Sequence, residues 1–303
     1  MNAVDVSVII PVHNRANMIG DAVHSALNQD TDATLEIIVV DDGSTDGSGE
    51  IAAAIDPRVQ VIRHEMARGP GAARNSGLAI AQGEYVAFLD SDDVFYPNRI
   101  SSALSYLQSH PKVILTCGGM SGGNNPFMLS SAASAPVHWT RPLQEMLKCG
   151  NPIYTPTVTA RLQAIKDCCC FDETLYCSQD YDLWIRMAEK GEFTHLSAIV
   201  AQLRRTSHGQ MTKRDARLNP AIIYARAWLK ANLSDEDRKL ARPVFATYVR
   251  MRLAQLVREK QGKAIWKDMA TFREALAWPE RMVWRMAAIA LWPFSCRAIA
   301  PTP

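Results

Sequence analysis

The residues best suited to chemistry in this sequence form the acidic run Asp90–Asp93. The run follows Glu84–Leu89, an apolar stretch with the composition of a buried strand. If the extended geometry continues, Asp90 and Asp92 point to the same side, because strand side chains alternate. Two such carboxylates suit a hard divalent cation, which takes oxygen ligands and bridges protein carboxylates to phosphates. A solvated acidic turn is the alternative, and the run alone does not exclude it.

Two other polar segments, residues 11–15 and 41–46, also follow predicted strands. Short β-rich runs alternate with runs of helical spacing, which predicts a parallel sheet with helices on both faces. Ligands of such sheets bind beyond the carboxyl ends of the strands, so the three polar segments are expected to form one site. The strands are predicted at Val6–Pro11, Glu36–Val40, Val59–Ile62 and Glu84–Leu89, and the helices at Asn17–Gln29, Ser48–Ala54 and Gly71–Ala81.

Two further motifs carry groups that could bind a ligand. Carboxylates of the segment 41–46, Asp42 among them, could accept hydrogen bonds from a nucleobase N–H or from ribose hydroxyls. A turn rich in Asp, Gly and Ser is the alternative, because these residues favour turns by themselves. The segment Gly69–Gly77 opens a predicted helix, where free N–H groups and Arg74 favour an anion. The alternative there is a helix cap with a surface arginine.

In this order and spacing, the motifs resemble the family-two inverting glycosyltransferases, which have the GT-A nucleotide-sugar-binding fold: a mostly parallel sheet flanked by helices. The resemblance runs from Val6 to about His208. It implies that Asp90 and Asp92 meet the Mn²⁺ or Mg²⁺ that holds the donor diphosphate, with Asp92 as the direct ligand. Asp42 would contact the nucleobase. The implied donor-binding residues are Pro11, Asp42, Arg74, Asn75, Asp90, Asp92 and His208.

The resemblance continues through the segments 150–153, 171–173 and 178–186. Family members carry an acidic pair where this chain has Gln179 and Asp180, so Asp180 inherits the role of general base. A carboxylate suits that role, because an inverting transfer needs one base to take the proton of the attacking hydroxyl. A carboxylate at a helix N-terminus, stabilised by the helix dipole, is the alternative. Cys169 and Cys170 replace a common Gly pair, so the backbone before Phe171 is expected to be less free.

The segment Arg204–His208 resembles the loop that closes the donor site in this family, where His208 would touch the diphosphate or the metal. An exposed loop histidine is the alternative.

Length and charge predict two parts. The 303 residues can hold one large α/β domain and an appendage. Residues 1–212 carry 15 Lys+Arg and 23 Asp+Glu, whereas residues 213–303 carry 18 and 8. We therefore expect a catalytic domain at 1–212 and a basic helical region at 213–303. Within that region, Arg281–Trp292 has the composition of a helix at an anionic membrane interface. A helix packed on the catalytic domain or on a second subunit is the alternative.

The N-terminal residues lack the basic region of a signal peptide, and no apolar run reaches the length of a membrane span. Seven cysteines without a secretory signal favour a reducing compartment. We expect a cytoplasmic enzyme, peripheral on the inner face of the membrane, with no nucleic-acid partner.

The predicted function is metal-dependent, inverting transfer of a sugar from a nucleotide-sugar donor to a hydroxyl of a glycan or lipid-linked acceptor, as in cell-surface polysaccharide synthesis. A non-catalytic nucleotide-sugar-binding or scaffold protein with the same fold is the alternative. A nucleotidyltransferase is expected to have a Gly-rich loop with Arg or Lys directly after the first strand, where this chain has the segment 11–15. A dinucleotide-binding fold fits poorly, because no G-x-G-x-x-G follows that strand.

Overall fold

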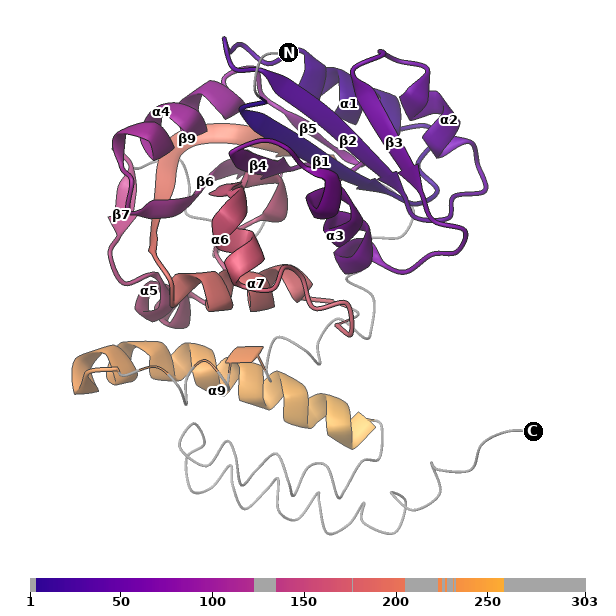
Figure 1. The fold of residues 1–303 in the computed structure, drawn as a ribbon. Coiled ribbons are helices and arrows are strands. Elements are labelled where there is room, and N and C mark those ends of the chain that lie inside the picture. The colour runs from indigo at the N-terminus through magenta and orange to yellow at the C-terminus, as the bar shows by residue number, and fades with distance from the viewer. Residues whose placement is uncertain are drawn as a thin grey trace. The chain divides into compact units, whose positions relative to one another are not determined.

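The computed structural model in Figure 1 describes residues 4–122, 135–175, 177–204, 223–224, 227, 231 and 233–258. The chain divides into two compact units. The first unit contains Met1–Pro142 and Asn151–Gln210, and the second contains Leu143–Gly150 and Met211–Pro303. The division at residue 212 stays a prediction.

The first half of the sheet has the alternation that the sequence predicts. Its strands and helices are β1 (Val6–Val12), α1 (Ile19–Leu27), β2 (Leu35–Asp41), α2 (Ser48–Ala53), β3 (Val59–Arg63), α3 (Pro70–Ile80) and β4 (Tyr85–Phe88). The strands pair in the order β3-β2-β1-β4, and every pair is parallel. Val12 pairs with Asp41, so the segments that follow β1 and β2 leave the sheet at one edge. This edge carries the polar segments.

The second half of the sheet is mixed. The sheet continues from β4 through β8, β6 and β9 to β5, with β7 also paired to β9. β8 is antiparallel to both β4 and β6. The sequence does not reveal β5, β7 and β8, because these strands have three residues each and are too short to show a period. The elements are β5 (Asp93–Phe95), α4 (Arg99–Ser109), β6 (Val113–Ser121), β7 (Val137–Trp139), the 3₁₀ turn η1 (Thr155–Thr157), β8 (Thr159–Arg161), α6 (Leu162–Asp167), α7 (Gln179–Ala188) and β9 (Glu192–Leu203).

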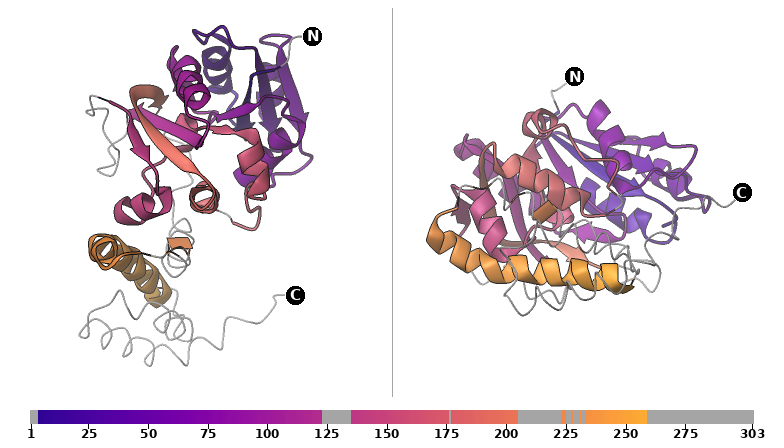
Figure 2. Two further views of the ribbon diagram at one scale, coloured as in Figure 1. Left: turned by 60° about the vertical axis from the view of Figure 1, so that its left-hand side comes forward. Right: turned by 90° about the horizontal axis from the view of Figure 1, so that it is seen from below.

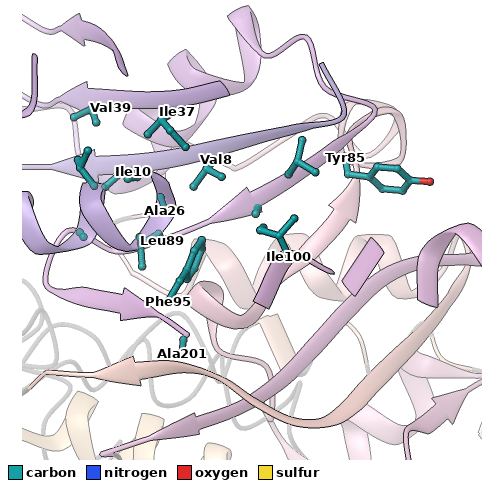
Figure 3. Packing of buried hydrophobic residues seen from close by; sticks show 14 of the residues in the cluster. Val8, Ile10, Ala26, Ile37, Val39, Tyr85, Leu89, Phe95, Ile100 and Ala201 are labelled. Carbon is teal, nitrogen blue, oxygen red and sulfur yellow. The ribbon is translucent and has the colours of Figure 1, made fainter. Parts of the chain in front are cut away.

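Helices cover both faces of β1. Val8 and Ile10 belong to the buried cluster that includes Ala26 of α1 and reaches Phe95 (Figure 3). Ile9, which points the other way, lies against Gly77 of α3 so closely that a methyl group there would meet the Ile9 side chain at 2.7 Å. Because strand side chains alternate, α1 and α3 must lie on opposite faces of the sheet. Figure 2 shows this twisted sheet from two further directions.

The turn that joins α6 to Phe171 has a backbone conformation that suits glycine better than cysteine. Cys169 and Cys170 have φ values of 61° and 57°, in the left-handed region that non-glycine residues rarely adopt. The guanidinium of Arg186 donates hydrogen bonds to the carbonyl oxygens of Cys168 and Cys170, the latter at 2.8 Å. Arg186 of α7 therefore binds the carbonyl oxygens at the end of α6 and holds the backbone before Phe171 in a strained turn.

The second unit includes most of α5 (Pro142–Cys149) and the long helix α9 (Asp235–Arg258). The Tyr224 hydroxyl donates to the carbonyl oxygen of Leu147, and its ring stacks on Phe245 with centroids 5.7 Å apart. Lys148 pairs with Asp237 at 2.7 Å. The buried face of α9 repeats every three or four residues, at Ala241, Phe245, Val249, Leu253 and Leu256. In the part of the chain that the structure describes, no helix has both the length and the apolarity of a bilayer span. Arg281–Trp292 lies outside the described residues.

We predict that Cys169→Gly stabilises the protein, because glycine adopts a φ of 61° without the penalty of about 1–2 kcal/mol that a side chain incurs. The extra chain entropy of glycine offsets about half of this gain. Cys168→Gly is the matched control, because Cys168 has a φ of −95° and gains nothing from the exchange. Thermal unfolding should show a higher Tm for Cys169→Gly and a lower Tm for Cys168→Gly. An equal fall in both variants would contradict the strain.

Candidate active site

Asp42 follows β2 and secures the next loop. Its Oδ1 accepts hydrogen bonds from the Arg68 N–H at 2.8 Å and from His64 Nδ1 at 2.7 Å. Its Oδ2 accepts the Gly69 N–H at 2.7 Å. His64 in turn reaches the Ser76 hydroxyl with Nε2 at 2.9 Å. The carboxylate thus fixes the loop that leads into α3, and a nucleobase would have to use the lone pairs that these bonds leave.

Arg74 interacts with two of the predicted site residues, Asp90 and Asp180. It is the fifth residue of α3, is 5% exposed, and donates from Nη2 to Asp90 Oδ1 at 2.6 Å. Its guanidinium stands over the Phe171 ring, 5.5 Å from the ring centroid. Nε and Nη1 are buried and have no hydrogen-bond partner among the described residues. A buried guanidinium with two unused donors is suited to an anion.

Asp180 is the second residue of α7, and Arg74 acts on it electrostatically. Its Oδ2 accepts the Thr155 hydroxyl at 3.0 Å, and its Oδ1 accepts the Tyr181 N–H at 2.8 Å. Burial raises the pKa of Asp180 above its ordinary value, and Asp90 adds to the rise. Arg74 and the two hydrogen bonds oppose it. The group is therefore a stronger base than a solvated aspartate, which suits proton abstraction.

The acidic run places its three carboxylates differently. Asp92 Oδ2 lies 3.8 Å from Arg15 Nε, and its side chain is about a quarter exposed. Asp93 is buried at the start of β5, where its Oδ1 accepts the Arg204 N–H at 3.1 Å. Burial raises the pKa of Asp93 to about 8. Burial likewise raises the pKa of Asp92, and the neighbouring Asp90 adds to the rise. Asp90 and Asp92 thus remain near solvent, while Asp93 belongs to the core.

These carboxylates have the chemistry of a cation site. Among the described residues, no group of three or more His, Cys, Asp or Glu side chains converges as a complete metal cage. Mg²⁺ is usually bound by one or two carboxylates together with substrate phosphates, so two partly exposed aspartates fit that mode. The mutual repulsion that raises the pKa of Asp92 is what a cation would relieve. Asp92 and Asp90 are thus the residues that could hold Mn²⁺ or Mg²⁺.

The other predicted donor-site residues have varied positions. Pro11 is buried in β1 beside Val40. The Asn75 amide binds the Phe171 backbone at 2.9 and 3.0 Å and donates to Glu173 at 2.9 Å, so it ties α3 to the segment before α7. His208 lies outside the described residues. The structure therefore brings Arg74, Asp90 and Asp180 together, while Asn75 supports the segment that leads to Asp180.

Three residues at the site escaped the sequence analysis as individual contributors. Arg15 faces Asp92, Thr155 donates to Asp180, and Arg204 links the acidic run to α1 through the Met18 carbonyl at 3.1 Å. Arg15 and Arg204 lie in segments that the sequence analysis assigned to the site, so their position in the sequence could have identified them. A threonine in an irregular segment carries no such signal, because hydroxyl side chains are common in turns.

Comparison with known proteins identifies the family. The profile described as "Glycosyl transferase family 2" matches residues 7–168, just over half of the chain. The chain belongs to the family-two glycosyltransferases. The uncharacterized glycosyltransferase RC0461 of Rickettsia conorii is 33% identical to it over 206 residues, which is 67% of this chain and 33% of that protein. The putative colanic acid biosynthesis glycosyl transferase WcaA of Escherichia coli K12 is 32% identical over 68% of this chain and 74% of its own length. This glycosyltransferase thus spans only about a third of the first of these relatives.

Solved structures share the fold of this glycosyltransferase. Residues 1–349 of TarS from S. aureus, in complex with UDP-GlcNAc, superpose with a TM-score of 0.73 at 21% identity, over 95% of this chain and 89% of that one. The mannosyltransferase PcManGT from Pyrobaculum calidifontis, in complex with GDP-Man and Mn²⁺, gives 0.62 at 18% identity, over 99% and 89%. The predicted fold class and the assignment as a glycosyltransferase are therefore confirmed.

The close approach of Gly43 to the loop before α3 yields a stability prediction. Gly43 has a φ of 70°, and a Cβ there would lie 2.7 Å from the Ala67 nitrogen. Gly47 has a φ of 84°, and a Cβ added there would meet no neighbouring heavy atom within 4 Å, so it isolates the cost of conformation alone. We expect Gly47→Ala to lower the free energy of unfolding by about 1–2 kcal/mol. Gly43→Ala should lower it by about 1–3 kcal/mol more, because the backbone of the loop must move. Urea unfolding compares the two, and equal losses would show that the loop does not press on Gly43.

Proposed function

We propose that this glycosyltransferase catalyses metal-dependent, inverting transfer of a sugar from a nucleotide-sugar donor to a hydroxyl of a glycan or lipid-linked acceptor. The observation that carries the proposal is the position of Arg74, paired with Asp90 and acting electrostatically on Asp180. One buried cation thereby connects a candidate donor-diphosphate site with a candidate base. Similarity to WcaA, whose name places it in colanic acid biosynthesis, supports an acceptor in polysaccharide synthesis.

The donor half of the site consists of Asp92, Asp90 and Arg74, with Asp42 and Pro11 at the nucleoside side. Asp92 and Asp90 would hold the Mn²⁺ or Mg²⁺, and a bound cation would supply positive charge for the departing nucleoside diphosphate. The unused donors of Arg74 contribute positive charge toward the same diphosphate. Complexes of TarS with UDP-GlcNAc and of PcManGT with GDP-Man and Mn²⁺ support this class of donor. His208 remains a proposed contact of the diphosphate.

The acceptor half depends on Asp180. Its carboxylate takes the proton of the acceptor hydroxyl as that oxygen forms a bond with the anomeric carbon. The bond between the anomeric carbon and the diphosphate oxygen breaks in the same displacement, and the configuration inverts. The electron pair of that bond leaves with the nucleoside diphosphate, so the enzyme forms no covalent intermediate.

We predict that Asp180→Asn lowers kcat by about 10²–10⁴-fold, because the amide cannot accept the proton. The assay measures nucleoside diphosphate release from a panel that begins with UDP-GlcNAc and GDP-mannose, with glycan acceptors. Asp182→Asn is the matched control, because that residue of the same helix pairs with Arg186 instead. Full activity of Asp180→Asn would remove the base from the proposal.

We also predict a pH dependence for the wild type. Its activity should fall as the pH drops through the pKa of Asp180. The fall should come at a higher pH than for a solvated aspartate, since burial raises that pKa.

We also predict that EDTA abolishes transfer and that Mn²⁺ or Mg²⁺ restores it, because one or two carboxylates and the diphosphate share the cation. Asp92→Asn should raise the metal concentration needed for half-maximal rate by about tenfold or more. Asp56→Asn serves as a control, since that carboxylate pairs with Arg58 and not with a residue of the site. Unchanged activity in EDTA would refute the metal role while leaving Asp180 untouched.

A further inference from the structure

A buried 3₁₀ turn stands beside the candidate base. The turn η1 spans Thr155–Thr157, and both of its threonines are almost fully buried. The Thr155 hydroxyl donates to Asp180 Oδ2 at 3.0 Å. The Thr157 hydroxyl donates instead to the Tyr154 carbonyl at 2.8 Å, within the turn itself. Two hydroxyls of one turn therefore have different partners, and only Thr155 reaches the carboxylate.

A buried arginine on α4 immobilises this turn. Arg99 is 1% exposed, and its guanidinium donates to the carbonyl oxygens of Pro156 and Val158 and to the Thr159 hydroxyl. Its charge also lies over the Phe95 ring, 4.5 Å from the centroid. Three hydrogen bonds from one planar group fix the backbone on both sides of Thr157. The Thr155 hydroxyl is thus presented from a rigid support and not from a mobile loop.

Two contacts fix the orientation of the Asp180 carboxylate. One oxygen accepts the Tyr181 N–H at the start of α7, and the other accepts the Thr155 hydroxyl. A donor on each oxygen prevents rotation about the bond from Cβ to the carboxylate carbon. Each carboxylate oxygen has two lone-pair positions, so an acceptor hydroxyl can still bind. Since the Tyr181 bond comes from the adjacent residue, Thr155 is the contact that depends on the tertiary fold.

We propose that Thr155 is the positioning residue of the base: its hydroxyl holds the Asp180 carboxylate in the orientation that receives the acceptor proton. The inference rests on the proposed role of Asp180 as general base. Without the Thr155 hydroxyl, the carboxylate rotates among several orientations, and few of them face an acceptor hydroxyl at hydrogen-bond distance. Loss of orientation slows the chemical step and leaves donor binding, which uses the other half of the site, unchanged.

The same hydrogen bond affects the proton affinity of Asp180. Burial raises the pKa of this carboxyl, and Asp90 adds to the rise, whereas Arg74, the Tyr181 N–H and the Thr155 hydroxyl lower the pKa. Removing the hydroxyl therefore shifts the pKa of Asp180 upward, because a bond to the charged form is lost. A residue that merely packed against α7 would not produce this shift.

The test compares four variants of the full chain. Thr155→Val keeps the shape of the side chain and removes the hydroxyl, whereas Thr155→Ser keeps the hydroxyl and removes the methyl group. Thr157→Val is the matched control, because its hydroxyl serves only the turn. Asp180→Asn both assigns the Asp180 signal and tests the base itself.

The first readout needs no substrate: ¹³C NMR follows the Asp180 carboxyl carbon through a pH titration. We expect a higher titration midpoint in Thr155→Val and wild-type midpoints in Thr155→Ser and Thr157→Val. The second readout is steady-state kinetics with the donor that the panel identifies. There kcat should fall about tenfold or more in Thr155→Val, with little change in the donor KM.

The outcomes separate the two proposals. A Thr155→Val midpoint equal to that of Thr157→Val overturns the positioning inference, even if Asp180→Asn is inactive. Equal damage in Thr155→Ser and Thr155→Val also overturns it, because packing would then be the role of Thr155. Full activity of Asp180→Asn removes the proposed base instead, and with it the reason for holding its carboxylate.

Discussion

The arrangement of the site depends on the burial of one cation, the Arg74 guanidinium. Taking an ion of this size out of water costs several kcal/mol unless partners compensate it. Asp90 provides the direct partner, and the charge of Asp180 lies near enough to be stabilised in return. The Phe171 ring covers the guanidinium from one side. Arg74 thus places one positive charge close to carboxylates from two distant segments of the chain.

The two halves of the sheet carry different residues of the candidate site. The parallel strands β1, β2 and β4 end at one edge of the sheet, which carries Asp42 and the acidic run. The mixed half, through η1 and α7, brings Asp180 and its hydrogen-bond donors. The Asn75 amide joins the halves by binding the Phe171 backbone, and Arg99 holds the turn η1 within the mixed half. The candidate donor and acceptor functions are therefore carried by separate elements whose relative position is fixed by hydrogen bonds.

Local strain accompanies this geometry. Asn14, Cys169, Cys170 and Ser178 have positive φ values, and all of them adjoin segments of the site. Ser178 starts α7 with a φ of 58° directly before Gln179 and Asp180. Such conformations persist only where surrounding contacts hold them, as Arg186 does for the turn before Phe171. The backbone that presents the base is accordingly shaped by tertiary contacts against its local preference.

Local patterns in the sequence are enough to predict the parallel half of the fold and the residue types of the site. The β-rich runs and helical spacing are local patterns, and the acidic run, Arg74 and Asp180 stand in motifs of family-two glycosyltransferases. What each of these groups contacts depends on the folded chain. In the folded chain, Asp42 binds the loop before α3, and Asp93 is buried. Thr155 donates to Asp180, and Arg99 holds the turn that carries Thr155. These pairings join residues far apart in the chain, and no local pattern encodes them, because burial and hydrogen-bond geometry exist only once the sheet has formed.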